Sequence, residues 1–164
     1  MITKKTPLFG MRTIKTMIAV YFCFMIGMLR GVMPFYSAIS AVLCMKKDID
    51  EGKRAGLHRM MGTVVGGVIG LAGLLIFREM PIPEFGWIHF LLITFGLAPV
   101  IYLMVALKAK EAVFIACVVF LSVTVSHGGD EQPFIFAFNR MIDTLIGILT
   151  ALAVNRVLPM KKEE

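Results

Sequence analysis

Residues 60–77 read MMGTVVGGVIGLAGLLIF, a stretch of eighteen residues without a charge. At about 1.5 Å of rise per residue, a helix of this length extends roughly 27 Å, close to the thickness of the hydrocarbon core of a bilayer. Gly62, Gly66 and Gly70 recur every four residues and therefore share one face. Because small residues let transmembrane helices approach closely, these glycines are predicted to be helix-packing residues of a membrane span.

Five further apolar stretches flank this one, separated by turns or charged residues. The second and fifth stretches are short for a crossing, so either flanking residues complete them or they are partly re-entrant. The sequence predicts an all-α integral membrane protein, a six-helix transmembrane bundle in which residues 1–164 form a single transmembrane domain. The predicted spans are 13–29, 32–46, 60–77, 87–107, 111–126 and 134–158.

The composition excludes a water-soluble domain of this size. Apolar residues make up 58% of the chain and charged residues only 17%, whereas soluble domains carry about 25% charged residues. The histidines are scattered and no pair of nearby buried carboxylates is evident, so we expect neither an enzyme nor a cofactor. Three cysteines, Cys23, Cys44 and Cys117, lie inside apolar stretches without metal-ligand spacing and are interpreted as packing residues.

The net charge of +6 does not indicate a nucleic-acid partner, because the basic residues lie in short clusters between the apolar stretches. Positively charged loops are retained on the cytoplasmic side of a membrane. With both termini inside, fourteen of the seventeen Lys and Arg residues are cytoplasmic, and the outer half keeps Arg30, Arg78 and Arg140. We therefore expect a multi-pass protein of the cytoplasmic membrane with both termini in the cytoplasm.

The last span carries a polar stripe at three- and four-residue spacing. A charge inside the hydrocarbon costs about 3 kcal/mol on insertion scales, so it is usually paired or faces a watery cavity. Either Arg140 and Asp143 form a pair that satisfies itself, or Arg140 binds an anion while Asp143 tunes the site or carries a proton; we favour the second interpretation. The stripe consists of Arg140, Asp143, Thr144, Gly147, Ala151 and Asn155.

Two other spans carry weaker patterns. Arg12 and Lys15 share a face at the start of the first span, where they either attract anions from the cytoplasm or anchor the helix at the headgroups. The anchor interpretation is favoured, and the two roles are compatible. In the second span, small residues follow one side of the helix and predict close packing: Ser37, Ser40, Ala41 and Cys44.

A short sequence at the start of the third span recurs in the sixth span. Residues 58–66 read HRMMGTVVG and residues 139–147 read NRMIDTLIG, so that Arg, Met, Thr and Gly recur in register. The two spans are expected to cross in opposite directions, which would make the halves two inverted three-helix repeats, as in many transporters. Four matches in nine residues are also compatible with chance, and both interpretations stay open.

Several segments resemble, in the same order, the aromatic acid exporter family, relatives of the fusaric acid resistance proteins. The resemblance covers nearly the whole chain. From the polar stripe and this motif we assign substrate binding to Asn139, Arg140, Asp143 and Thr144, together with Lys15 and Arg12 at the cytoplasmic entrance. The segments are 12–20 (RTIKTMIAV), 34–42 (PFYSAISAV), 54–59 (RAGLHR) with Gly62, Thr63 and Gly66, and Asn139-Arg140 with Asp143, Thr144 and Gly147.

The resemblance implies an inner-membrane efflux transporter for small aromatic or other organic acid anions, driven by the proton gradient. A passive anion channel and a non-transporting membrane scaffold subunit are the alternatives. The implied partners are the lipid bilayer, a small organic anion and further copies of the chain, without nucleic acid. Many family members continue into a cytoplasmic C-terminal domain, whereas this sequence ends at residues 161–164 (KKEE), which favours a homo-oligomer.

Overall fold

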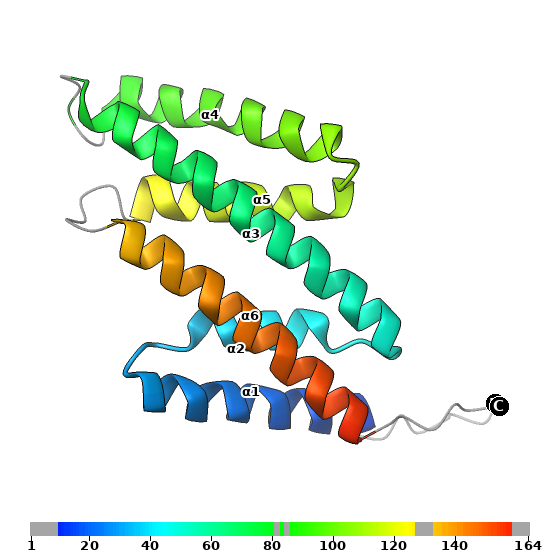
Figure 1. Ribbon diagram of the computed structural model, residues 1–164. Coiled ribbons are helices and arrows are strands. Elements are labelled where there is room, and N and C mark those ends of the chain that lie inside the picture. The colour runs from blue at the N-terminus through cyan, green and yellow to red at the C-terminus, as the bar shows by residue number, and fades with distance from the viewer. Residues whose placement is uncertain (1–9, 81–82, 84–85, 127–132, 159–164) are drawn as a thin grey trace, which may run out of the picture. The chain divides into compact units, whose positions relative to one another are not determined.

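The computed structural model describes residues 10–80, 83, 86–126 and 133–158, and this part of the chain is helical with short connections. The prediction of an all-α protein is confirmed. Figure 1 shows the elements in chain order. They are α1 (Met11–Arg30), α2 (Phe35–Cys44), α3 (Ile49–Arg78), α4 (Trp87–Ala106), η1 (Lys110–Ala112), α5 (Val113–Leu121), η2 (Ser122–Ser126) and α6 (Pro133–Val157).

Among the described residues, four helices are long and apolar enough to cross a membrane, namely α1, α3, α4 and α6. Each spans at least 20 residues, so each reaches about 30 Å or more at 1.5 Å per residue. The chain is therefore a multi-pass membrane protein.

The remaining two predicted spans contain short helices. α2 has ten residues, which at 1.5 Å per residue extend about 15 Å, half of the hydrocarbon core. α5 has nine residues and is extended at its two ends by the 3₁₀ turn η1 and the π-helical segment η2. Helix length thus supports four of the six predicted crossings. It does not establish the six-span bundle.

The described residues form two compact units. The first unit contains α1, α2, the start of α3 as far as Gly56, and α6 from Asp143 onward. The second unit runs from Leu57 to Ile142 and contains the rest of α3, α4, α5 and the start of α6. Each unit is therefore assembled from segments that lie in both halves of the sequence.

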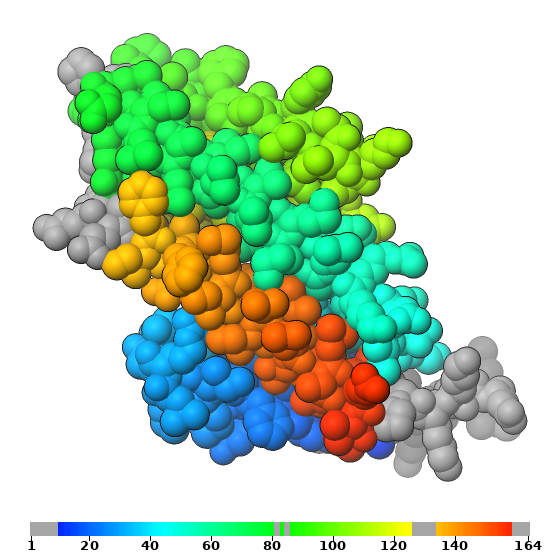
Figure 2. Space-filling view, in the orientation of Figure 1, coloured from blue at the N-terminus to red at the C-terminus, as the bar shows by residue number. Residues whose placement is uncertain are grey.

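The first unit packs through small side chains. Figure 1 draws α1 and α2 side by side with the carboxyl-terminal part of α6 across them, and in Figure 2 atoms of that part of α6 border those of α1. A Cβ at Gly147 of α6 would collide with the carbonyl oxygen of Ser37, so α6 touches the backbone of α2. The buried stripes are Lys15, Ala19, Cys23 and Gly27 on α1, and Ser37, Ser40, Ala41 and Cys44 on α2, the latter as predicted.

The second unit has an apolar core between α3, α4 and α5, which lie next to one another in Figure 1. α3 approaches α5 through its glycines: a Cβ at Gly62 would lie 2.8 Å from the carbonyl oxygen of Ala112, and one at Gly66 would collide with that of Ala116. A larger residue at either position would force the two helices apart. The core residues are Ile93, Val100, Met104, Ala109, Ala112, Ala116 and Phe120.

Candidate functional site

The polar stripe predicted on the last span is buried along α6. Its charged and polar members are at most 5% exposed, and Gly147 and Ala151 between them are buried as well. Elsewhere in the described chain, Lys15 and Arg59 are the other charged side chains that are buried. Because an ionised group in a membrane helix requires a partner or a watery surrounding, these positions are the candidates for function.

Lys15 lies in a polar contact at one end of the first unit. Its Nζ donates a hydrogen bond to Oδ1 of Asn155 on α6, at 3.1 Å. Nδ2 of Asn155 donates in turn to the carbonyl oxygen of Lys46, at 3.2 Å. This chain of contacts brings together the start of α1, the end of α6 and the connection between α2 and α3.

Lys15 differs from an anchoring lysine because its side chain is fully buried. An anchoring side chain extends into the headgroup region instead. Within the described residues, no carboxylate lies within 4.0 Å of its ammonium group, whose partner Asn155 is neutral. An ammonium group has three donors, so this arrangement suits an anion as an additional partner.

A second charged contact lies near the other end of α1, where Arg30 pairs with Asp143 of α6. The Asp143 side chain is 4% exposed and that of Arg30 is 25% exposed. The sequence suggested Arg140 as the alternative partner of Asp143, and Arg30 was not among the predicted site residues. Arg30 ends the first span, and sequence spacing alone could not bring it to a residue 113 positions later.

The other predicted binding residues lie in different surroundings. In the second unit, Arg140 is buried and its Nη1 donates to the hydroxyl of Ser122, the first residue of η2, at 2.8 Å. Asn139 beside it is half-buried. In the first unit Thr144 is buried, whereas Arg12 is exposed. Arg12 and Lys15 were expected to act together, yet only Lys15 is enclosed.

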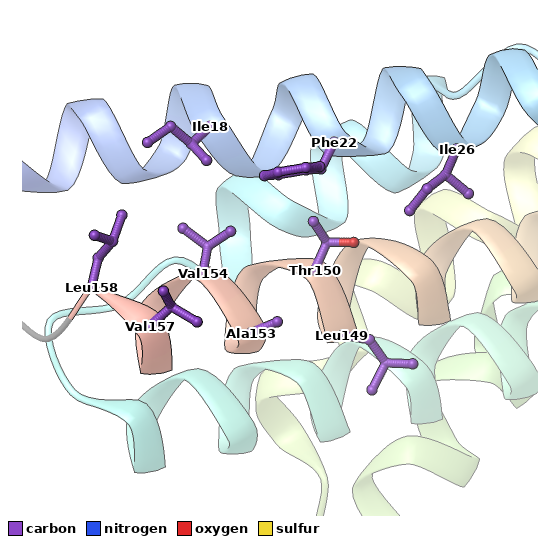
Figure 3. Close-up of a pocket in the computed structure, with 9 residues that line it drawn as sticks. All are labelled: Ile18, Phe22, Ile26, Leu149, Thr150, Ala153, Val154, Val157 and Leu158. Carbon is purple, nitrogen blue, oxygen red and sulfur yellow. The ribbon is translucent and has the colours of Figure 1, made fainter.

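An open groove of about 470 Å³ lies between α1 and α6 in the first unit. Figure 3 shows side chains of α1, including Phe22, facing Thr150 and Val154 of α6. The hydroxyl of Thr150 already donates to the carbonyl oxygen of Ile146. The groove is therefore apolar and suits hydrocarbon, in contrast to the polar contacts of Lys15 and Arg30.

The described residues contain no group of three or more His, Cys, Asp or Glu side chains that could hold a metal ion. Cys23, Cys44 and Cys117 are free cysteines, two of them buried and one half-buried. The buried polar positions offer hydrogen bonding and charge pairing by Lys, Arg, Asp, Asn, Ser and Thr side chains.

Comparison with known proteins gives curated relatives of similar sequence. A UPF0421 protein of Staphylococcus epidermidis is 24% identical over 149 residues, 91% of this chain and 42% of the relative. One of Staphylococcus haemolyticus is 24% identical over 93% of this chain and 44% of the relative. The UPF0421 protein YgaE of Bacillus subtilis is 28% identical over 94% and 41%, respectively.

The chain thus spans less than half the length of these relatives. No solved structure gives a significant match. Residues 12–154 match the family described as fusaric acid resistance protein-like, a range that takes in Lys15, Arg30, Arg140 and Asp143. The chain is therefore a member of the fusaric acid resistance protein-like family of membrane proteins.

Proposed function

We propose that this chain forms the membrane part of an efflux transporter for small aromatic or other organic acid anions, driven by the proton gradient. Membership of the fusaric acid resistance protein-like family supports transport. The observation that carries the proposal is the fully buried Lys15 ammonium, whose protein partner is the neutral amide of Asn155. A carboxylate arriving at this group would supply the missing negative charge.

Arg140 is a second cation that would bind the carboxylate of the substrate. Its guanidinium is buried and donates to a hydroxyl, and a guanidinium can bind a carboxylate through two parallel hydrogen bonds. Asp143, paired with Arg30, is the candidate for a proton carrier, because a carboxylate that accepts a proton releases its cationic partner. Substrate binding is thus assigned to Lys15, Asn139, Arg140, Asp143 and Thr144. Arg12 is proposed to attract anions at the entrance.

The direct test is flux of ¹⁴C-benzoate in proteoliposomes, with and without an imposed pH gradient. Gradient-dependent accumulation above that of protein-free vesicles supports the exporter. Dissipative flux that ignores the gradient indicates a passive anion channel instead. Absence of flux, measured also with salicylate, indicates a non-transporting scaffold and contradicts the proposal.

The role of Lys15 is tested by Lys15→Met, which keeps most of the length of the side chain and removes its charge. We expect benzoate flux to fall at least about tenfold, because a charge-assisted hydrogen bond contributes roughly 1.5–3 kcal/mol. Lys47→Met is the control, since Lys47 is exposed in the same end region of the first unit. Equal flux in both variants at equal membrane abundance would remove Lys15 from the site.

We further propose that both termini are cytoplasmic. The contacts of Asn155 with Lys15 and with the carbonyl of Lys46 support a common side for the start of α1 and the end of α6, and the basic clusters identify that side as the cytoplasm. Single cysteines in 46–54 should therefore resist an impermeant thiol reagent applied to intact cells, whereas cysteines in 128–132 should react. The reverse pattern contradicts the orientation.

The six-span bundle and its inverted repeat are part of this proposal. In the first unit α6 packs on α2, and in the second unit α3 packs on α5. The short helix of each half of the sequence therefore packs against the last long helix of the other half. Non-helical backbone next to α2 is tolerable at membrane depth if it is covered by protein or lines an aqueous cavity, and α5 is lengthened by the helical segments η1 and η2.

A homo-oligomer is also proposed, because α1 exposes large apolar side chains and six spans, two of them with short helices, leave a single chain little room to enclose a path. Cross-linking in native membranes should give a dimer or a larger ring. A monomer at every cross-linker concentration would contradict the oligomer without affecting the other assignments.

A further inference from the structure

Arg59 in α3 is the counterpart of Arg140 in α6. In both copies of the recurring sequence, residues 58–66 and 139–147, an arginine is followed by threonine after four residues and by glycine after seven. Both arginines are buried, at 8% and 5% exposure, and the threonines Thr63 and Thr144 are buried too. The likeness therefore extends from the sequence to the burial of these side chains.

The glycines of the two copies also pack in the same way. A Cβ at Gly66 would collide with the carbonyl oxygen of Ala116 on α5, and one at Gly147 with that of Ser37 on α2. Each glycine thus lies against the backbone of the short helix in its own unit. A chance likeness of nine residues would not be expected to reproduce this contact, so the two arginines occupy equivalent positions in their copies.

Within the second unit, the two arginines belong to opposite ends of α5. His58, the residue before Arg59, lies with Nδ1 2.8 Å from Oε2 of Glu111 in η1, directly before α5. At the other end, Arg140 binds Ser122, directly after α5. Ten residues of helix separate Ala112 from Ser122, about 15 Å along the axis.

The burial of Arg59 distinguishes it from the basic residues that precede it. Arg54 and Lys53, on the same helix, are exposed, as expected of side chains that extend to headgroups. Nineteen residues of helix separate Arg59 from Arg78, about 29 Å, which matches the hydrocarbon core. With Arg78 at the outer surface, Arg59 lies at the cytoplasmic boundary of the span.

We propose that Arg59 binds the carboxylate of the transported anion at the cytoplasmic end of α5, as Arg140 binds it at the outer end. The inference rests on the proposed function. It adds Arg59 to the binding residues, and the anion reaches Arg59 before Arg140 during efflux. The guanidinium offers a pair of parallel donors to a carboxylate in both positions. Lys15, in the first unit, is a separate cation and is not needed for the equivalence of the two arginines.

The experiment compares the two faces of the membrane. Everted vesicles expose the cytoplasmic face to added ¹⁴C-benzoate, and right-side-out vesicles expose the outer face. Arg59→Gln should raise the half-saturating benzoate concentration about tenfold in everted vesicles and less than about twofold in right-side-out vesicles. Arg140→Gln should show the opposite preference, and Arg54→Gln, the matched control on α3, should match the wild type in both.

Equal changes in both vesicle types, or none in either, would overturn the assignment of Arg59 while leaving Arg140 untouched. Absence of benzoate and salicylate transport by the wild type is a different result, which removes the proposed function itself. If Arg59→Gln does not reach the membrane, Arg59→Lys replaces it, because it keeps the charge but loses the two-donor fork. A rise of about threefold confined to everted vesicles then supports the proposal, and wild-type values in both overturn it.

Discussion

The carboxylate of Asp143 on α6 pairs with the guanidinium of Arg30 on α1, although 113 positions separate the two residues. The pair lies in the same unit as the contact between Lys15 and Asn155, so α1 and α6 are joined by a polar contact near each end of α1. Small residues occupy the buried stripe of α1 between these contacts. These small residues let α1 pack closely on α2, whereas α1 and α6 are joined by the two polar contacts beside the open groove.

Breaking the Arg30–Asp143 pair should destabilise the protein. We expect Asp143→Asn and Arg30→Gln each to lower the free energy of unfolding by about 2 kcal/mol, less than a fully buried pair because Arg30 is one quarter exposed. Thermal unfolding of the purified protein in detergent measures the change. The double variant should cost less than the sum of the two single variants, and strict additivity would contradict a direct pair.

Asn155→Asp should raise the stability of the protein and lower its transport activity. The new carboxylate would lie beside the Lys15 ammonium and supply the negative charge that the neutral amide lacks. We therefore expect a higher unfolding temperature together with benzoate flux reduced at least about tenfold, since an internal carboxylate competes with the substrate. Asn155→Leu, which removes the contact without adding charge, is the control and should lower the unfolding temperature. Full transport by Asn155→Asp would show that the anion does not use Lys15.

Arg140→Gln should leave membrane insertion intact and reduce benzoate flux at least about tenfold, because a neutral amide cannot replace the charge-assisted contact. Arg140→Lys should restore part of the flux, since the ammonium keeps the charge but not the fork. Flux is compared at equal membrane abundance, measured by quantitative immunoblotting. Normal flux in Arg140→Gln would return this residue to a structural role through its contact with Ser122.

Gly66→Ala should disrupt the contact between α3 and α5. Its Cβ would meet the carbonyl oxygen of Ala116, and backbone cannot move aside as a flexible side chain can. We expect a loss of about 2 kcal/mol or more in unfolding free energy, at the level of overpacked cores. Gly67→Ala is the matched control, because the nearest atom to its Cβ would be Cγ1 of Val119 at 4.0 Å. Similar stability of both variants would show that α3 and α5 are not closely packed at Gly66.

Most of the secondary structure and its buried faces could be predicted from local pattern. Long apolar stretches indicate the long helices, since each must satisfy its own backbone hydrogen bonds in lipid. The buried face of α2 and the buried stripe of α6 follow from three- and four-residue spacing, because a helix brings such residues to one side. The short apolar stretches also indicated that these two spans are short. They did not predict the residues at which α2 and α5 begin and end.

Sequence by itself therefore determined the class of protein, the long helices and which side of each patterned helix is buried, all of which depend on neighbours within a few positions. Tertiary structure alone decided which buried groups meet: Asp143 with Arg30 and Lys15 with Asn155, across 113 and 140 positions. It also enclosed Lys15 and left Arg12 exposed. Spacing along one helix carries no information about a partner on another helix, because that depends on how the packed helices are placed side by side.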